Sequence, residues 1–432
     1  MRRILIFSLV YYPNHIGGAE VAIKEITGRI PPSEIEFDMV TLRLDSRLPK
    51  FERIGNVNIY RVGWAGKQRT SSDSLPWYLH LNKYAMLWSA FRKASALHRE
   101  RKYDATWSLM ATYNSFAALF FKLTHLKVPF LFTLQDGDPI PYLKRRALPL
   151  YPLFKMIFTR ADHIQCISNY LADWAKEMGV KCPVSVVPNG VNYRLFSERV
   201  PESRLGALQG QIGRKDGDIF LITASRLVVK NAVGDIIEAL KYLPTNVKLL
   251  VLGTGYEEKR LRELAREIEA VGVGENGTLF LKNHGLPRGE REREVGRMVF
   301  QKQSSILSDA TQRVQFLGHI SHDELPAYLQ ASDIFIRPSL SEGFGNSFIE
   351  AMAAGIPVIA TPVGGIVDFL KDGETGLFCE VKNPKSIAQK VEKLIKDKES
   401  REHIVRNARK MVEEKYDWGN VAGDMKAILQ TL

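Results

Sequence analysis

The chain has 432 residues, of which 45% are hydrophobic and 25% charged, with a formal net charge of +12. This composition is ordinary for a globular protein of two or three domains, and it excludes a disordered or fibrous chain. Residues 1–200 hold 28 Lys and Arg against 16 Asp and Glu, whereas residues 201–432 hold 32 of each. The first half therefore favours an anionic partner, either nucleic acid or an acidic membrane surface.

Three cysteines, Cys166, Cys182 and Cys379, are too few and too scattered for a disulfide framework, and no C-x-x-C pair indicates a zinc site. A reduced, cytoplasmic compartment fits this usage. The apolar run that starts at Ile4 has no small-residue cleavage site after it, so we predict a buried strand rather than a signal peptide. No apolar run reaches the length of about 18 residues that a membrane-spanning helix needs.

Predicted strands and helices alternate along the first half. Runs of β-branched and apolar residues predict buried strands at residues 4–10, 37–42, 57–62, 105–108, 130–134, 161–167 and 184–187. Helical patterns lie between them at residues 18–29, 77–100, 115–123 and 169–178. This alternation predicts parallel β-α-β units in a doubly wound sheet.

The pattern restarts at residue 218. Strands are predicted at residues 218–225, 247–252, 314–317, 334–337 and 358–361, and helices at 257–270, 325–331 and 347–354. The polar stretch 196–217 indicates a domain boundary, and the highly charged segment 283–312 is expected to be a solvated insertion. The fold class is therefore α/β with two open domains, in which ligands bind beyond the carboxyl ends of the strands.

The most specific motif is Glu342-Gly-Phe-Gly-Asn-Ser-Phe-Ile-Glu350, which follows the strand predicted at 334–337. Gly343 and Gly345 let backbone N–H groups approach a ligand, and Asn346 or Ser347 is expected to cap the helix that begins there. A fully helical segment would separate the two glutamates by about 12 Å along its axis. That exceeds the roughly 5–9.5 Å of a glycosidase carboxylate pair, but it suits two groups that grip separate parts of one long ligand.

Three further loops have residues suited to phosphate. Arg226 and Lys230 are four residues apart after a predicted strand, so a turn can bring both cations to one anion. Gly17 and Gly18 open a helix without matching a dinucleotide-binding fingerprint. Gly253 belongs to a Leu-Gly-Thr-Gly turn after the strand at 247–252. Taken singly, each of these loops fits an ordinary turn or surface ion pair as well.

In this order, the motifs resemble those of the retaining glycosyltransferases of family 4. That family has the GT-B fold, in which two facing Rossmann-like doubly wound domains enclose a cleft. The resemblance spans nearly the whole chain, including VVPNGVNYRLF at 186–196, the block from 314 to 365 and DGETGLF at 372–378. It implies an acceptor-binding domain at 1–200, a nucleotide-sugar-binding domain at 201–400, and a helical segment at 401–432 that crosses back to the first domain.

The resemblance also implies a role for each motif. Arg226 and Lys230 would hold the donor's diphosphate, Glu342 would bind hydroxyls of the transferred sugar, and Glu350 would bind the ribose. The donor would further meet the glycine loops and the start of the helix, at Gly17, Gly18, Gly253, Phe344, Gly345, Asn346 and Ser347. Enzymes of this type need no metal, and the sequence has no obvious cluster of metal-binding carboxylates. The expected small-molecule partner is a nucleotide diphosphate sugar, with no further cofactor.

One position departs from the family pattern. Gln135 stands at the end of the strand predicted at 130–134, where the family usually has a His. Gln can hydrogen-bond a sugar hydroxyl but cannot change charge near neutral pH, and Asp136 is the nearest ionisable neighbour. Two alternatives to the transferase stay open: a GT-B-fold nucleotide-sugar epimerase, and a non-catalytic protein that binds a nucleotide sugar, for which Gln135 is the only support in the sequence.

The surplus positive charge lies near aromatic residues in two stretches, 77–102 and 142–160. The second stretch has no acidic residue and contains Lys144, Arg145, Arg146 and Lys155. Such a basic amphipathic segment can lie on an anionic bilayer, although buried aromatics with solvated cations give the same pattern. No nucleic-acid-binding motif accompanies the charge. We expect a cytoplasmic hexosyltransferase, peripheral at the inner face of the membrane, with a lipid-linked or saccharide acceptor of glycolipid or surface polysaccharide synthesis.

Overall fold

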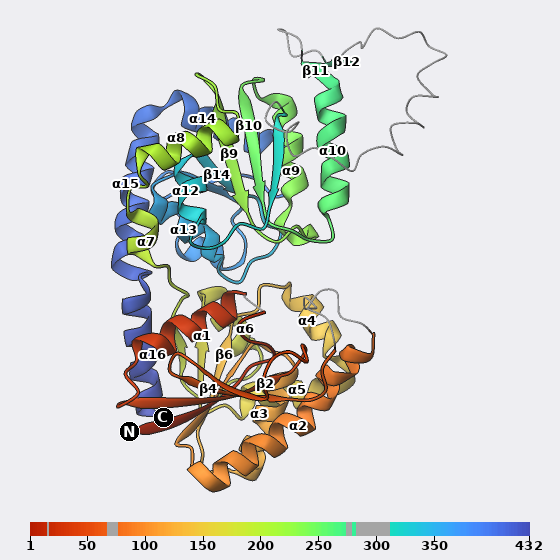
Figure 1. Ribbon diagram of the computed structural model, residues 1–432, viewed down its shortest axis with the longest axis vertical. Helices are drawn as coiled ribbons and strands as arrows, with labels where there is room; N and C mark the ends of the chain where they lie inside the picture. The colour runs from red at the N-terminus through yellow and green to blue at the C-terminus, as the bar shows by residue number, and fades with distance from the viewer. Residues whose placement is uncertain (15–16, 67–76, 274–278, 282–311) are drawn as a thin grey trace.

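The computed structural model describes residues 1–14, 17–66, 77–273, 279–281 and 312–432. They form two α/β domains, the N-terminal one in the lower half of Figure 1 and the C-terminal one in the upper half. The insertion expected at 283–312 lies outside the described residues except for its last position. Within the described ranges, no helix combines the length and the apolar character needed to cross a bilayer.

The sheet of the N-terminal domain contains eight strands among the described residues, in the order β3-β4-β2-β1-β5-β6-β7-β8. β3 pairs with β4 in antiparallel fashion, and the other pairs are parallel. A parallel sheet is covered on both faces, which explains the near-continuous apolar runs of its strands. The strands are β1 (Arg2–Phe7), β2 (Ile35–Leu42), β3 (Phe51–Ile54), β4 (Val57–Val62), β5 (Ala105–Leu109), β6 (Phe130–Leu134), β7 (His163–Cys166) and β8 (Val184–Val186).

Alternate side chains of β1 enter two different hydrophobic cores. Ile4 and Ile6 pack with α1 (Gly18–Arg29) and α16 (Trp418–Thr431), whereas Leu5 and Phe7 pack with helices on the opposite face. The two-residue period of a strand thus builds a three-layer domain. The helices of the second face are α2 (Trp77–Arg101), α3 (Tyr113–Thr124), α4 (Ile140–Arg146), α5 (Tyr151–Thr159) and α6 (Asn169–Glu177).

The sheet of the C-terminal domain is parallel, with the order β13-β10-β9-β14-β15-β16 among the described residues. β9 lies between β10 and β14, so the chain reverses its direction of travel across the sheet at the β9–β14 pair. Ligands of doubly wound folds bind beyond the strand ends at such a switch point. The strands are β9 (Ile219–Ala224), β10 (Val247–Leu252), β13 (Val314–Gly318), β14 (Ile334–Arg337), β15 (Val358–Ala360) and β16 (Leu377–Phe378).

Helices cover both faces of this second sheet. α9 (Val233–Ala239), α10 (Glu258–Ala270) and α14 (Pro384–Lys396) share one core with it. α12 (Leu325–Gln330) and α13 (Asn346–Ala354) contribute to the hydrophobic core on the other face of the sheet. α15 (Lys398–Lys415) packs against α13. A short antiparallel pair, β11 (Val271–Val273) and β12 (Leu279–Leu281), follows α10.

Two segments connect the domains. The stretch 196–217, which we interpreted as a polar boundary, contains the end of α7 (Tyr193–Ser197) and all of α8 (Glu202–Gln211). Farther along, Tyr416 accepts a hydrogen bond from the Val191 amide at 2.7 Å, and the Trp418 amide donates to the Val191 carbonyl at 3.2 Å. α16 then runs along the N-terminal domain beside α1, on the left in Figure 1.

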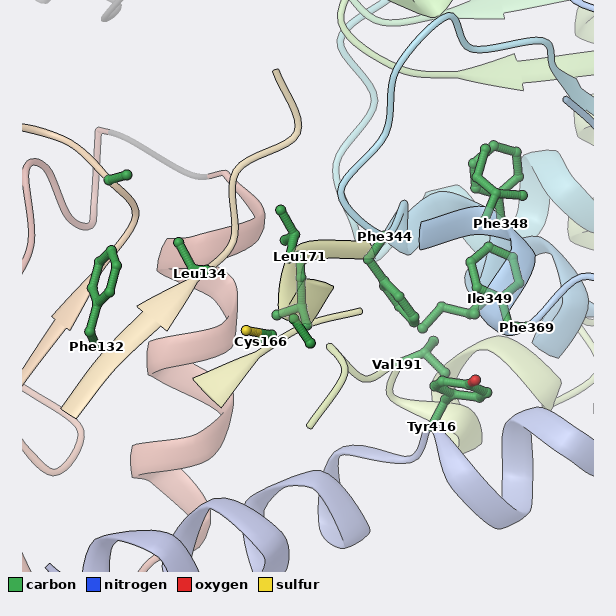
Figure 2. Packing of buried hydrophobic residues seen from close by; sticks show 14 of the residues in the cluster. Phe132, Leu134, Cys166, Leu171, Val191, Phe344, Phe348, Ile349, Phe369 and Tyr416 are labelled. Atoms are coloured by element: carbon green, nitrogen blue, oxygen red, sulfur yellow. The ribbon is translucent and has the colours of Figure 1, made fainter. Parts of the chain in front are cut away.

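A continuous apolar core passes through this connection (Figure 2). Val191 and Tyr416 belong to one cluster with Phe132 and Leu171 of the N-terminal domain and Phe344 of the C-terminal domain, and they lie beside Phe344 in this view. The Tyr416 ring centroid lies 5.6 Å from that of Phe344. Apolar contacts as well as the chain itself therefore join the two domains at this point.

The prediction of two doubly wound α/β domains is confirmed, and each predicted element boundary lies within three residues of the observed one. β1 ends at Phe7 rather than Val10, because the Ser8 hydroxyl donates to the Val10 carbonyl at 2.8 Å and turns the chain. The edge strands β3 and β16 were not predicted. They have four and two residues, too few to show an apolar run.

The crossing helix gives a test of stability. Trp418 is 2% exposed in the core that joins α16 to the N-terminal domain, so Trp418→Ala should lower the free energy of unfolding by about 3–5 kcal/mol. Trp64, which is 49% exposed, supplies the control. Trp64→Ala should change the free energy of unfolding by less than about 0.5 kcal/mol. Urea unfolding followed by circular dichroism measures both. Equal midpoints for Trp418→Ala and the wild type would contradict the role of α16.

Candidate active site

Loops from both domains meet at the carboxyl ends of the strands. Lys230 follows β9, and its Nζ donates to the carbonyl of Gly137, which follows β6, at 2.7 Å. The same Nζ pairs with Asp138 at 3.1 Å, and the Leu340 amide donates to the Lys230 carbonyl at 2.6 Å. Lys230 therefore links the loops after β6, β9 and β14, and its charge lies at the junction of the two domains.

Arg226 lies on the same loop as Lys230. The Asn231 side chain donates to the Arg226 carbonyl at 2.7 Å, which fixes the loop. Glu20 of α1 lies close enough to Arg226 to interact with it electrostatically. Burial raises the pKa of the Glu20 carboxyl, while its hydrogen bond from the Gly17 amide at 2.8 Å and the charge of Arg226 oppose that shift. The first glycine loop and the expected diphosphate cations are thus neighbours.

Glu342 is held on both of its oxygens. Its Oε2 lies 2.5 Å from Nη2 of Arg337, and its Oε1 accepts from the Gly343 amide at 3.1 Å. Gly343 must be glycine, because a Cβ there would lie 2.5 Å from the Asp136 carbonyl oxygen. Gly345 has a φ of +96°, a left-handed conformation in which a side chain is strained.

The expected cap of α13 is wrong. Gly345 occupies the N-cap position and no side chain caps the helix, because Asn346 and Ser347 are used elsewhere. The Ser347 hydroxyl accepts from Nη1 of Arg337 at 2.7 Å, and the Asn346 side-chain oxygen accepts from Asn189 at 3.1 Å. The helix N-terminus consequently keeps backbone N–H groups that no side chain in the described ranges caps, as an anion site requires.

Glu350 lies inside α13 and is 9% exposed. Its Oε1 lies 3.1 Å from Nε2 of His322, whose ring packs edge-on against Phe196. The hydrogen bond that the His322 ring donates to Glu350 raises the pKa of His322, burial opposes that rise, and the charges of Asp323 and Glu25 add to it. Glu350 thus has a titratable partner that the sequence did not reveal.

A chain of amides crosses the domain junction. The Gln135 side chain donates to Asn189 at 3.0 Å, and Asn189 donates to Asn346 at 3.1 Å. The Cα hydrogens of Gly18 face the two asparagine side chains, since a Cβ there would lie 3.8–3.9 Å from their nitrogens. Gln135 Oε1 is buried and has no hydrogen-bond partner in the described part of the chain. Neutral amides occupy the place where the family pattern has an ionisable ring.

Asp136 lies beneath this chain and is 2% exposed. Burial raises the pKa of its carboxyl to about 6, Asp138 adds to that rise, and the hydrogen bond from the Ala111 amide at 3.1 Å opposes it. Because it is buried, Asp136 belongs to the interior and not to the basic surface. Arg146 of that surface is nevertheless close enough to lower the same pKa.

The remaining residues predicted from the sequence either support the loops of the site or lie at the protein surface. Gly253, at φ +122°, lets its turn pack on the Arg226 loop, because a Cβ would lie 1.9 Å from the Ser225 carbonyl oxygen. The Phe344 ring is buried against Phe369 and Tyr416 and anchors the loop that carries Glu342. Other predicted residues lie at the surface, where Lys144 is half-buried and Arg145, Arg146 and Lys155 are exposed.

Five residues at this junction were not predicted from the sequence: Glu20, Asp138, Asn189, His322 and Arg337. Arg337 had a usable signal, because a cation that ends the apolar run Ile-Phe-Ile-Arg must find a partner or reach solvent. Asp138, Asn189 and His322 lie far along the chain from the groups they contact, and Glu20 lies far from Arg226. Among the described residues, no group of three or more His, Cys, Asp or Glu side chains could hold a metal ion.

Comparison with known proteins identifies the family. Two family profiles match, "Glycosyltransferase Family 4" over residues 16–195 and "Glycosyl transferases group 1" over residues 300–411. An uncharacterized glycosyltransferase of Methanocaldococcus jannaschii is 24% identical over 97% of this chain and 96% of its own. The Staphylococcus aureus capsular polysaccharide biosynthesis glycosyltransferase CapM is 30% identical over 65% of each chain.

Solved structures of other proteins have a similar fold. Anabaena HepE, solved in complex with UDP-glucose, superposes with a TM-score of 0.70 at 17% identity and full coverage of both chains. The GT-B fold predicted from the motifs is thereby confirmed. The chain belongs to glycosyltransferase family 4, a family of retaining hexosyltransferases, and it transfers a sugar from a nucleotide sugar.

The Lys230–Asp138 pair predicts opposite effects of two substitutions. Asp138 competes with a diphosphate for Lys230, so Asp138→Asn should tighten nucleoside diphosphate binding by about two- to fivefold, as expected for a partly exposed pair. Lys230→Ala should weaken it at least about tenfold, because a charged hydrogen bond is lost. Calorimetric titration with ADP, GDP, CDP and UDP in turn measures both. Equal affinities in the wild type and Lys230→Ala would refute this assignment.

The His322–Glu350 pair predicts a change in titration. Glu350→Gln should lower the pKa of His322, because a neutral amide cannot stabilise the imidazolium. Since folding raises this pKa above its usual 6.5, the pair stabilises the fold fully below about pH 6.5, and that contribution is lost as the pH rises through the folded-state value. Because the His322 side chain is 48% exposed and solvent screens the pair, this contribution to stability is about 1 kcal/mol or less.

NMR titration of the His322 ring measures this shift directly. Asp323→Asn is the matched control, because it removes a charge that contributes less than Glu350, and it should lower the pKa by a smaller amount. The same titration curve in Glu350→Gln as in the wild type would contradict the pairing.

Proposed function

We propose that this enzyme moves a hexose from a nucleoside diphosphate sugar to a lipid-linked or saccharide acceptor at the inner face of a membrane. The anomeric configuration is retained, and the product enters glycolipid or surface polysaccharide synthesis. The observation that carries the proposal is an exposed apolar and basic face on the N-terminal domain, formed by α2, the start of α3, and α4. The name of CapM, a capsular polysaccharide enzyme, supports the same context.

The apolar part of this face is a stripe on α2. Leu81, Tyr84 and Trp88 are spaced by three and four residues, so they lie on one side of the helix, and they are 52%, 58% and 66% exposed. Scattered exposed apolar residues are normal, but three in one row favour contact with another apolar surface. We call this row together with Tyr142, Leu148, Lys144, Arg145 and Arg146 the docking face.

The basic part adjoins the stripe through aromatic contacts. The Tyr84 and Tyr113 rings meet edge-on at 5.1 Å, and the Arg146 guanidinium lies 5.8 Å above the Tyr113 ring. Arg145 lies over Tyr142 of the same helix, and Leu148, just beyond α4, is 65% exposed. Two stretches that are separate in the sequence therefore form one surface.

The free energy that the docking face can contribute suits reversible attachment to a membrane. Three cations at about 1 kcal/mol each give roughly 3 kcal/mol, which is a little over 100-fold in partition onto an anionic bilayer. Partial insertion of Trp88 and Tyr84 adds to this, since both rings have an apolar body and a polar group. Because Arg146 also interacts with Asp136 near the junction, a membrane-held acceptor would come near the strand ends.

At the junction, the proposed chemistry uses the residues of the C-terminal domain. The bond between the sugar and the diphosphate breaks with its electron pair on the phosphate, and Arg226, Lys230 and the N-terminus of α13 stabilise that charge. Glu342 binds sugar hydroxyls, and Glu350 binds the ribose. The acceptor oxygen forms the new bond to the anomeric carbon, and its proton passes to the departing diphosphate.

A panel of nucleotide sugars distinguishes this function from its alternatives. UDP-glucose is the first donor to test, because HepE was solved in complex with it. A transferase releases the nucleoside diphosphate slowly in water and faster with an acceptor. An epimerase returns a rearranged nucleotide sugar, and a non-catalytic protein returns the donor unchanged; either result would contradict the proposal.

Vesicle binding tests the docking face. The triple variant Lys144→Glu, Arg145→Glu, Arg146→Glu should lose sedimentation with phosphatidylglycerol vesicles by at least about 100-fold, because attraction becomes repulsion. The control reverses Lys393, Lys396 and Lys398, which are exposed at the end of α14 and the start of α15 in the other domain. It carries the same change in charge and should bind as the wild type does. Undiminished binding by the α4 variant would overturn the docking face.

A further inference from the structure

Arg337 is a cation buried beside the two glutamates of the site. It ends β14, is 6% exposed, and its guanidinium lies 4.2 Å above the Phe348 ring. Its two terminal nitrogens contact Glu342 and Ser347 at 2.5 and 2.7 Å. Its Nε is buried and has no hydrogen-bond partner in the described ranges.

Stability alone gives no account of this arrangement. Burying a guanidinium costs free energy that its ion pair only partly returns, and an apolar pair of the same size often stabilises a core as well. Burial lowers the pKa of Arg337, and the charges of both Glu342 and Glu350 counteract that effect. One buried cation therefore interacts with both glutamates of the motif.

The geometry also fixes the orientation of one carboxylate. Glu342 has Arg337 on Oε2 and the Gly343 amide on Oε1, so neither oxygen is free to rotate away. A planar guanidinium that is itself held by Ser347 and Phe348 restricts Glu342 more than a flexible ammonium would. Two carboxylates beside a diphosphate would otherwise repel it, and a fixed cation that interacts with both reduces that repulsion.

We propose that Arg337 is a positioning residue that acts through Glu342: it holds the carboxylate in the orientation that meets the sugar hydroxyls and offsets its charge beside the donor's diphosphate. The proposal rests on the proposed function of Glu342. Arg337 itself touches no substrate, because Glu342, Ser347 and the Phe348 ring surround its guanidinium.

A double-mutant cycle in turnover tests this claim. Arg337→Met keeps the length and removes the charge, and it should lower the turnover of UDP-glucose, or of the best donor in the panel, about 100-fold. UDP affinity should fall less, by about two- to tenfold, because UDP has no sugar for Glu342 to bind but its diphosphate meets the uncompensated carboxylate. In a Glu342→Gln background, the same substitution should cost less than about fivefold more. If Arg337→Met lowered turnover as much in the Glu342→Gln background as in the wild type, the two residues would act independently and the proposal would be overturned.

A second measurement needs no substrate and therefore separates this proposal from the proposed function. The amide of Gly343 donates to Glu342, so its NMR resonance reports where the carboxylate lies. It should shift in Arg337→Met and in Glu342→Gln in the same direction. An unchanged Gly343 resonance in Arg337→Met would overturn the proposal whether or not any nucleotide sugar is turned over.

Two variants separate positioning from folding. Arg214 also pairs with a carboxylate, Asp333, and lies 5.4 Å over a Phe ring in the same domain, but its contacts lie at the other end of β14. Arg214→Met should reduce stability while leaving the Gly343 resonance and turnover per folded molecule unchanged. Arg337→Lys retains the buried charge, so it should fold and recover at least about tenfold of the turnover lost in Arg337→Met. A loss in Arg337→Lys as large as in Arg337→Met, with the Gly343 resonance unmoved, would contradict the mechanism.

Discussion

Lys230 spans the junction between two parallel sheets whose strand ends face each other. Its ammonium lies against the loop after β6, and its backbone accepts from the loop after β14. This contact exists because β9 and β14 are neighbours at the switch point of the second sheet, while the apolar connection through Val191 and Tyr416 holds the first sheet opposite. Every group proposed to bind the donor is then within one loop of the junction.

Charge compensation gives the site its second constraint. Glu342 is paired with Arg337, and Glu350 with His322, so each acidic residue of the motif has a partner before any ligand arrives. Lys230 is paired with Asp138. A diphosphate can exchange with a partly exposed carboxylate at small cost, whereas the buried Arg337–Glu342 pair is too costly to break during turnover. The donor site is in this sense organised before the donor binds.

Much of the fold could be predicted, because long apolar strands and the glycines after them are local patterns. Arg226, Lys230, Glu342 and Glu350 were proposed from such patterns together with the family resemblance, and the structure places their loops around one junction. The partners Asp138, Asn189 and His322 could not be predicted, because each is about 28 to 160 residues away in the chain from the group it contacts. The expected cap by Asn346 or Ser347 failed because both side chains have other partners: Asn346 contacts the distant Asn189, and Ser347 contacts Arg337, ten residues earlier.

A crystal structure of the chain with a bound nucleotide sugar, beginning with UDP-glucose, tests the central claim most directly. We expect the diphosphate beside Arg226 and the N-terminus of α13, with Lys230 Nζ moved from Asp138 to a phosphate oxygen. The sugar hydroxyls should then lie within hydrogen-bond distance of Glu342, whose contact with Arg337 is unchanged. A nucleotide bound away from the β9 and β14 loops, or a sugar that does not reach Glu342, would contradict the account.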